Sequence, residues 1–448
     1  MNTRYGRAGA LACAAAIALT ASACAGGGSS SSSTSTSPSA AASATTISKP
    51  VTITFDEVFA AGSLKTAMQS AVTAFEKANP KITVDLTTYA TYGPLLTAET
   101  AQVAAGKAPT MGQAYESWAE KFATSKVIVP ISSLPGAAST MASQLATFYT
   151  GIQNDLKLPD GQTWMWPFGK SLQVLFYNGS LLKADGIASP PTTWTQFAAD
   201  LKTASKNGVT GITIDPGNAT EGTTSGEEWL EEVAASNGTP VYASDGTPRF
   251  TSPAVVSAMN YLVNLKQAGA LATGTNYPGE TALGAKKGLV DLSSSAGYYY
   301  EQQSVGSKFP LTTTGLPSGS AGSANEMAGA NLVVFASATT EQKAAAWKFL
   351  QYLAGPAEQA AWSSATGYYP VTSQALTQPA MASYLKQNPW VKTTIDGLNS
   401  AIVDPPYAWV TQCGIDLSTA LSAALSGTSA SAALTTAQNA CTTAKSSA

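Results

Sequence analysis

Residues Trp164–Asn178 read WMWPFGKSLQVLFYN, an aromatic segment of loop character followed by an unbroken apolar run. The Trp166-Pro167 pair favours an extended backbone, because a residue before proline is pushed out of the α region. Gly169 allows the backbone to approach another segment closely, and Val174–Tyr177 has the length of a buried strand. The stretch therefore predicts a loop that feeds a buried strand, although the same aromatics would also suit an ordinary core.

Length and composition restrict the class of protein. A chain of 448 residues is too long for one ordinary core, which predicts two lobes. Charged residues make up 11% and the formal net charge is -3, which favours neither nucleic acid nor an anionic membrane surface as a partner. The chain has no histidine, which excludes Ser-His-Asp and Cys-His catalysis, His-rich zinc sites and HExxH metalloproteases. Chemistry based on a pair of carboxylates remains open.

The N-terminal segment has the parts of an export signal. Arg4 and Arg7 precede an apolar run over residues 8–19, and small residues lead to Cys24. We expect residues 1–23 to be a lipoprotein signal peptide and Cys24 to be lipidated, which would hold the protein at the outer face of the cell membrane. The alternative is an ordinary secretory signal cleaved at the same place. Residues 24–49 are rich in Gly, Ser, Thr and Ala and predict an unfolded tether.

Two further cysteines lie near the C-terminal end. Export would place Cys413 and Cys441 in an environment where disulfides persist. A disulfide between them is one prediction and two buried free thiols are the alternative, because the sequence does not give their separation.

Strand and helix patterns alternate along the rest of the chain. Alternating or apolar strand patterns occur at residues 51–55, 82–86, 110–115, 209–214 and 331–336. Between and after them, the 3.6-residue period predicts helices, among them residues 92–105, 193–206, 227–236, 253–268 and 340–353. This β-α-β order is typical of doubly wound α/β lobes. The segment over residues 315–328 is rich in Gly, Ser and Pro and suits a crossing back toward the first lobe, and we expect another crossing near residues 355–367.

Several stretches in one order resemble the sn-glycerol-3-phosphate-binding branch of the extracellular solute-binding proteins, family 1, that serve ABC importers. They are Thr88–Tyr92, Gln113–Glu116, Leu175–Asn178, Pro191–Trp194, Ser293–Gly297, Gly329–Leu332 and Thr366–Val371. The resemblance implies an α/β, two-lobe periplasmic-binding-protein fold (type II), with a doubly wound sheet in each lobe and several chain crossings in the hinge. Lobe 1 would comprise residues 50–170 and 327–360, and lobe 2 residues 171–326 and 361–448.

The same resemblance implies the positions of the ligand-binding residues. Carried over position by position, these are Tyr92, Glu116, Ser171, Ser294 or Ser295, the backbone N–H of Gly329, and Tyr368. Tyr, Ser and Glu supply the paired donors and acceptors that a hydroxylated ligand needs. We expect a monomer without metal or cofactor that delivers its ligand to ABC permease subunits and performs no catalysis.

One departure from the branch concerns the ligand phosphate. The branch holds it with an arginine in the C-terminal helical region, whereas residues 405–414 here contain neither Arg nor Lys. Lys170 is a candidate substitute, and Trp409 would suit a sugar or a choline-like group. Asp56 and Glu57 stand where the branch has a Trp-His pair, and carboxylates facing the cleft would repel a phosphate. The ligand is therefore left open between a carbohydrate, a polyol, a glycerol phosphate and a glycerophosphodiester.

A secreted carbohydrate-active hydrolase using paired carboxylates is the alternative function. Its most obvious acids are Glu227, Glu228, Glu231 and Glu232. Their spacing is that of a solvated helix face, which is how we interpret them. A surface adhesin would be expected to show internal repeats, and the sequence contains none of 20 to 50 residues.

Overall fold

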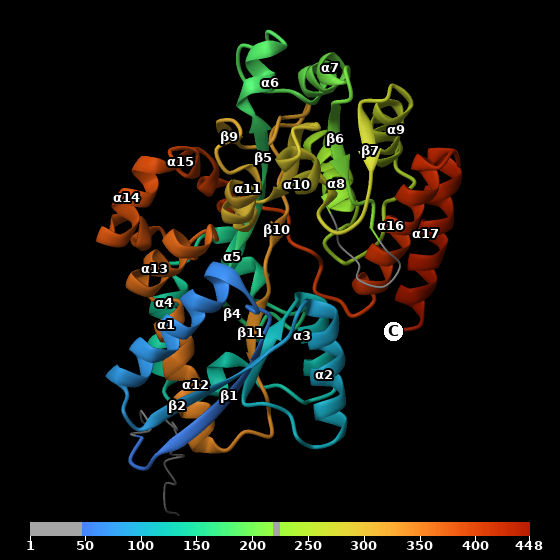
Figure 1. Cartoon of the computed structure of the whole chain (residues 1–448). Helices are drawn as coiled ribbons and strands as arrows, with labels where there is room; N and C mark the ends of the chain where they lie inside the picture. The colour runs from blue at the N-terminus through green and yellow to red at the C-terminus, as the bar shows by residue number, and fades with distance from the viewer. Residues whose placement is uncertain (1–46, 218–224) are drawn as a thin grey trace, which may run out of the picture. The chain divides into compact units, whose positions relative to one another are not determined.

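The computed structural model describes residues 47–217 and 225–448. The predicted signal peptide, the lipidation site Cys24 and the tether up to residue 46 lie outside the described residues. Within them, the chain forms two β-sheets covered by helices, shown in the lower and upper halves of Figure 1. The expected mixed α/β fold with two lobes is confirmed.

The first sheet has the strand order β2-β1-β3-β11-β4. Its strands are β1 (Val51–Glu57), β2 (Ile82–Thr88), β3 (Met111–Ala114), β4 (Trp166–Pro167) and β11 (Asn331–Val334). The first three are parallel, and β11 runs antiparallel between β3 and β4. The helices after β1, β2, β3 and β11 are α1 (Gly62–Ala78), α2 (Tyr92–Ala104), α3 (Glu116–Thr124) and α12 (Thr340–Leu353). This is the β-α-β-α-β order that the sequence predicts.

The second sheet has the strand order β10-β5-β8-β6-β7, and β9 also pairs with β5. Its strands are β5 (Ser171–Asn178), β6 (Thr210–Ile214), β7 (Leu271–Thr273), β8 (Gly288–Ser294), β9 (Leu311–Thr314) and β10 (Met327–Ala328). Every residue of β5 is buried, which confirms the strand predicted in the opening stretch. Strands buried on both faces read as continuous apolar runs, as Val174–Tyr177 does.

The remaining helices surround these sheets. They are α4 (Ala137–Leu145), α5 (Thr150–Asp155), α6 (Gly179–Ala184), α7 (Trp194–Ala204), α8 (Ser225–Ser236), α9 (Pro253–Gln267), α10 (Pro278–Gly284), α11 (Tyr298–Val305), α13 (Pro356–Thr366), α14 (Pro379–Gln387), α15 (Trp390–Thr394), α16 (Val410–Leu425) and α17 (Ala430–Ser446). Thr193 begins α7 with a capping box that includes Gln196, as its position before the periodic pattern indicates. The C-terminal helices α16 and α17 pack on each other and on α9 (Figure 1).

The chain crosses between the sheets within the opening stretch. Trp166 pairs with Leu332 in the first sheet, whereas Leu172 pairs with Met327 in the second. A second crossing runs back through Gly329, whose φ of +98° favours glycine. A Cβ added to Gly329 would lie 2.0 Å from the carbonyl oxygen of Gly169, so the two crossings are in backbone contact. The predicted hinge with several crossings is confirmed.

A third crossing lies further along the chain than expected. The helix α13, within the segment predicted to cross, packs on α1. Buried side chains from Trp362 to Leu398 also belong to the first core, the apolar cluster built around the first sheet. Those from Val410 onward belong to the second core, the cluster around the second sheet. The side chains thus change core between residues 398 and 410, because α13 packs on α1 and α12 of the first lobe and α14 packs on α13. The exact lobe boundaries stay a prediction.

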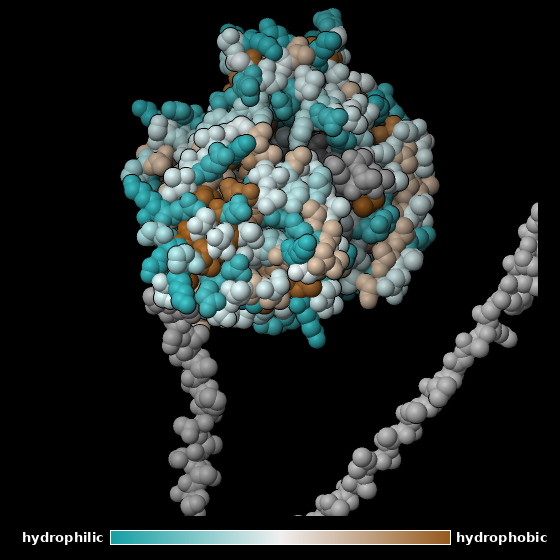
Figure 2. Space-filling model, turned by 60° about the horizontal axis from the view of Figure 1, so that its bottom comes forward, coloured by the Kyte–Doolittle hydropathy of each residue, from teal (hydrophilic) through white to brown (hydrophobic). Residues whose placement is uncertain are grey.

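Cys413 and Cys441 form a disulfide that joins α16 to α17, with their Cα atoms 4.7 Å apart. None of the helices in residues 47–217 and 225–448 is both long and apolar enough to cross a membrane. On the face drawn in Figure 2, teal and white residues predominate and brown ones are confined to a few separate areas. The large hydrophobic side chains described as exposed are Tyr277 and Tyr300.

A buried carboxyl pair in the second lobe leads to a pH prediction. Glu301 on α11 and Asp291 on β8 are 2% and 6% exposed. Burial, reinforced by the charge of Asp291, raises the pKa of Glu301 to about 11 from an ordinary 4.5. Protonated Glu301 therefore donates a hydrogen bond to Asp291. Burial raises the pKa of Asp291 to about 6. The folded state keeps a proton that the unfolded state loses, so this pair makes stability fall as the pH rises above 4.5 toward 11.

We expect Glu301→Gln to keep the hydrogen-bond donor and remove this titration. The free energy of unfolding should then fall less steeply between pH 5 and pH 8, by up to about 1.4 kcal/mol per pH unit. Urea unfolding of both proteins at the two pH values measures the difference. An identical pH dependence in variant and wild type would contradict the assignment.

Candidate functional site

Tyr92, Tyr115 and Tyr368 form a tyrosine cluster next to the first sheet. Tyr92 follows β2 at the start of α2, and Tyr115 directly follows β3. Their rings lie edge to face with centroids 4.9 Å apart, and Trp118 lies 5.3 Å from Tyr115. The hydroxyl groups of Tyr92 and Tyr368 interact by hydrogen bonding. In doubly wound sheets the carboxyl ends of the strands are where ligands bind.

The three tyrosines present neutral hydroxyl groups and aromatic faces. Each ring is partly exposed. Burial of the hydroxyl groups raises the pKa of Tyr92, Tyr115 and Tyr368, so all three remain protonated at neutral pH. Tyr368 also stacks on the buried Trp362, with ring centroids 5.9 Å apart and an interplanar angle of 28°. A tyrosine hydroxyl both donates and accepts hydrogen bonds, which suits a hydroxylated ligand.

Lys170 lies in a buried polar cluster directly beneath the crossing. Its Nζ atom is 2.7 Å from Asp155 Oδ2 and 3.9 Å from Glu116 Oε1. It donates a hydrogen bond of 2.6 Å to the carbonyl oxygen of Gly329. Asn331 Nδ2 donates to both Asp155 and Glu116, at 2.8 and 3.0 Å. The cluster joins α5, α3 and β11 to both crossing segments.

The cluster is close to electrically neutral inside. Burial, followed by the negative charge of Asp155, raises the pKa of Glu116 well above its ordinary value, although Lys170 opposes this. Glu116 is therefore protonated and Asp155 carries the charge that pairs with Lys170. Since Lys170 is 1% exposed and already bound to two oxygens, a ligand phosphate could reach it only by displacing them.

The serines predicted for the site lie on the second-sheet side of the crossing. Ser171 is buried and pairs with Ala328 across β5 and β10. Ser294 is partly exposed, and its hydroxyl accepts from the N–H of Ala296. Ser295 is fully buried and interacts with the hydroxyl of Tyr369. Ser294 is therefore more accessible to a ligand than Ser295.

Trp409 lies in a different environment from the tyrosines. It stacks on Tyr407, with ring centroids 4.3 Å apart, and Lys445 Nζ lies 5.8 Å from its ring. The neighbouring backbone contacts the first lobe, since the N–H of Ala408 donates to Glu120 Oε2 at 3.1 Å. The Trp409 ring itself packs against the second core and lies near Lys445 of α17. Its described contacts do not include Tyr92, Tyr115 or Tyr368.

Comparison with known proteins decides the family. Residues 70–389 match the family model described as bacterial extracellular solute-binding protein. The chain belongs to this family. The sn-glycerol-3-phosphate-binding periplasmic protein UgpB of Yersinia pestis is 26% identical over 349 residues, which cover 73% of this chain and 76% of UgpB. UgpB of Escherichia coli K12 is 26% identical over 359 residues, 74% of this chain and 77% of that protein. The predicted resemblance to this branch is confirmed.

Solved structures show the same fold as this solute-binding protein. UgpB from Mycobacterium tuberculosis, in complex with glycerophosphocholine, superposes with a TM-score of 0.78 at 19% identity and covers 89% of this chain and 99% of its own. The GacH receptor of Streptomyces glaucescens superposes with a TM-score of 0.75 at 19% identity, covering 88% and 98%. At this level of identity, the likeness concerns the fold alone.

One feature of the solute-binding protein differs from the sequence interpretation, and a second settles a point that the sequence left open. The acids of α8 are not a solvated face: Glu227, Glu231 and Glu232 are at most 4% exposed. The prediction was wrong because α16 packs over α8, and Ser418 on α16 donates a hydrogen bond of 2.7 Å to Glu227. Asp56 and Glu57, whose orientation was open, are both 1% exposed, and Glu57 accepts from the N–H of Phe59.

Sequence reasoning did not place Tyr115 or Glu228 at the candidate site, although it named Glu228 as a possible acid of a hydrolase. Tyr115 directly precedes Glu116, and its place at the end of β3 was the available signal. Glu228 on α8 accepts a hydrogen bond from Gln173 of β5, and its charge acts on Tyr115. Burial raises the pKa of Glu228 to about 7. No local motif marks Glu228, because its neighbours come from distant parts of the chain.

Proposed function

We propose that this chain is the solute-binding component of an ABC importer that captures a small hydroxylated solute between its lobes and delivers it to a permease. The tyrosine cluster carries the proposal, because neutral hydroxyl groups and aromatic faces at the carboxyl ends of β2 and β3 match the chemistry of a carbohydrate or polyol. No step of binding and release requires a catalytic group. Closure would be a hinge motion about the crossing segments.

The charges around the tyrosine cluster suggest an order of preference among the candidate ligands. The charge of Glu228 acts on Tyr115, Glu116 is protonated, and Lys170 is already paired with Asp155. A phosphate monoester dianion would therefore find the negative charge of Glu228 and no unpaired cation among the residues described around the tyrosines. We place neutral carbohydrates and polyols first, then a zwitterionic glycerophosphodiester of the kind bound by the M. tuberculosis protein, and glycerol phosphate last.

The predicted site residues take different parts in this proposal. Tyr92, Tyr368, Ser294 and the N–H of Gly329 would contact the solute, with Ser171 and Ser295 behind them. Glu116 and Lys170 would hold the crossing in place beneath it. Trp409 would contact a solute only if the solute extends toward α16.

The proposed location is outside the cytoplasm, with a lipid anchor at Cys24. Extracytoplasmic placement follows from the family and from the periplasmic relatives. The anchor rests on the sequence around Cys24 alone. Metabolic labelling with palmitate of the wild type and of a Cys24→Ala variant tests it.

Thermal unfolding of the protein against a solute panel tests the function. The panel contains mono- and oligosaccharides, glycerol, glycerophosphocholine and sn-glycerol 3-phosphate. A solute at 100 times its dissociation constant should add about 2.7 kcal/mol of stability and raise the midpoint. No shift with any solute, or turnover of a chromogenic glycoside, would contradict the proposal.

We expect Tyr368→Ala to weaken binding of the stabilising solute at least about tenfold, which corresponds to about 1.4 kcal/mol. The variant removes both the hydroxyl that interacts with Tyr92 and the aromatic face. Isothermal titration calorimetry measures the change. Tyr352→Ala is the control, because that ring packs on Phe75 and its hydroxyl donates to Glu358, away from the cluster. Equal affinity in wild type and Tyr368→Ala would remove Tyr368 from the site.

A further inference from the structure

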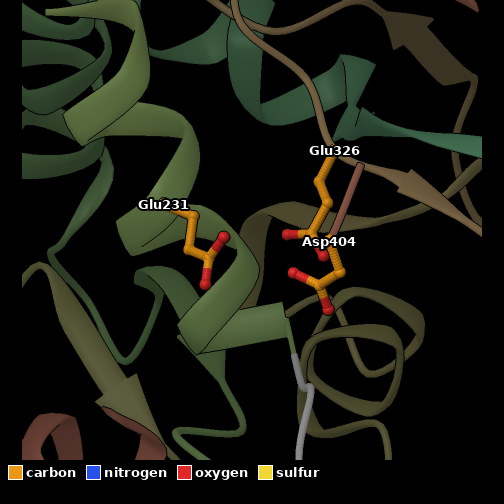
Figure 3. A group of neighbouring side chains, drawn as sticks. All are labelled: Glu231, Glu326 and Asp404. Atoms are coloured by element: carbon orange, nitrogen blue, oxygen red, sulfur yellow. The ribbon is translucent and has the colours of Figure 1, made fainter. Parts of the chain in front are cut away.

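Three carboxylates converge on one point in the second lobe. Glu231 comes from α8, Glu326 directly precedes β10, and Asp404 lies in the third crossing. One oxygen atom from each lies within 4.8 Å of the other two. Figure 3 shows the side chains pointing toward one another from these separate segments. Glu231 and Asp404 also line a cavity of about 330 Å³.

No lysine or arginine among the described residues forms an ion pair with these three side chains. Glu231 and Glu326 are 4% and 7% exposed. The Oε2 atom of Glu326 is buried without a hydrogen-bond partner in the described part of the chain. Within residues 47–217 and 225–448, the ion pairs involve Lys170, Lys206 and Lys445, and none reaches these three acids. Burying an unpaired carboxylate is unfavourable, so such a group must hold a proton or a cation.

The three carboxylates lie close together, and two of them are almost fully buried. Carboxylates at this separation repel one another when they are ionised. A bound cation would offset that repulsion and favour the ionised carboxylates.

We propose that Glu231, Glu326 and Asp404 bind a divalent cation, and that Ca²⁺ is the ion that fits. Hard cations prefer carboxylate oxygens, and Ca²⁺ takes six to eight of them at about 2.3–2.6 Å in flexible geometry. Ligand oxygens up to 4.8 Å apart can therefore share one Ca²⁺ ion. Mg²⁺ needs shorter bonds of about 2.0–2.1 Å in a stricter octahedron. The adjoining cavity has room for water molecules that complete the coordination.

Such an ion would connect α8 to the second and third crossings, which carry Glu326 and Asp404. The segments that carry Glu326 and Asp404 are already paired, because the N–H of Met327 donates to Ile402 O and the N–H of Ile402 donates to Asn325 O, each at 2.9 Å. Glu231 would add α8 to this pair. The ion would therefore stabilise the hinge side of the second lobe, separately from the tyrosine cluster.

Calorimetric titration of the full chain, freed of metal with EDTA, tests the site. We expect one Ca²⁺ ion per chain, with Mg²⁺ at least tenfold weaker, and a higher midpoint of thermal unfolding with Ca²⁺ than with EDTA. Glu326→Gln and Asp404→Asn should each weaken Ca²⁺ binding at least tenfold. Glu301→Gln is the matched control, since it replaces another buried carboxyl of the same lobe and should leave Ca²⁺ binding unchanged.

The metal-free midpoint separates loss of the site from loss of the fold. Replacing one of several mutually repelling carboxylates with an amide should leave the metal-free variant at least as stable as the metal-free wild type. The proposal fails if the wild type binds no Ca²⁺, or if both variants bind it as tightly as the wild type does. Stabilisation by tetramethylammonium without any by Ca²⁺ would also overturn it, by assigning the acids to a cationic organic group.

Discussion

Replacing Lys170 with methionine is expected to lower the free energy of unfolding by about 3–5 kcal/mol, because it leaves a buried carboxylate without its partner. Lys170 and Asp155 are 1% and 2% exposed, and their charged atoms lie 2.7 Å apart. The variant also removes the donor to Gly329 O, which would remain buried without that bond. Urea unfolding at pH 7 measures the change.

Lys206→Met is the matched control. Its partner Asp185 lies 2.8 Å away, but the Lys206 side chain is 54% exposed. Exposed pairs contribute about 0–1 kcal/mol, so the control should change stability little. Adding Asp155→Asn to Lys170→Met should restore part of the loss, because it removes the unpaired charge. Similar losses in Lys170→Met and Lys206→Met would show that burial of the cluster does not have the assigned effect.

The hinge was predictable because its sequence signals are local. The Trp-Pro pair, Gly169 and the apolar run after it each act on their own few residues, and together they place a loop before a buried strand. The third crossing was misplaced for the opposite reason. We expected it near residues 355–367, whereas the packing of α13 on α1 keeps that segment in the first core. Tertiary contacts of this kind leave no local signal.

The candidate site was predictable only where its residues carry a local sequence signal. The family resemblance predicted Tyr92 and Glu116, which lie just after the ends of β2 and β3, where ligands bind in such sheets. Tyr115 has the same local signal and was missed. The environment of Lys170 depends on Asp155 and Asn331, which come from α5 and β11. The spacing of the glutamates on α8 indicates a helix, but only the position of α16 shows that the helix is buried. Charge compensation between distant segments therefore lay beyond the sequence.

Removing the disulfide with Cys413→Ala and Cys441→Ala together is expected to lower the free energy of unfolding by about 3–4 kcal/mol in the chain-entropy model. The bond closes a loop with a sequence separation of 28 and joins α16 to α17. Opening that loop increases the conformational freedom of the unfolded chain. Both cysteines are fully buried, so alanine avoids burying an unpaired hydroxyl. Urea unfolding of the oxidised wild type and the double variant measures the difference.

The number of steps in urea unfolding of the double variant shows whether α17 stays bound without the disulfide. Gln438 on α17 binds the segment beside α9, accepting from the N–H of Phe250 at 2.8 Å and donating to Pro248 O at 2.9 Å. If these contacts suffice, the double variant should still unfold in one step at lower urea. In the native wild type both sulfurs should resist maleimide, because they are bonded and buried. Reaction of Cys413 or Cys441 with maleimide before reduction, or a change below about 1 kcal/mol, would contradict a stabilising bond between the two helices.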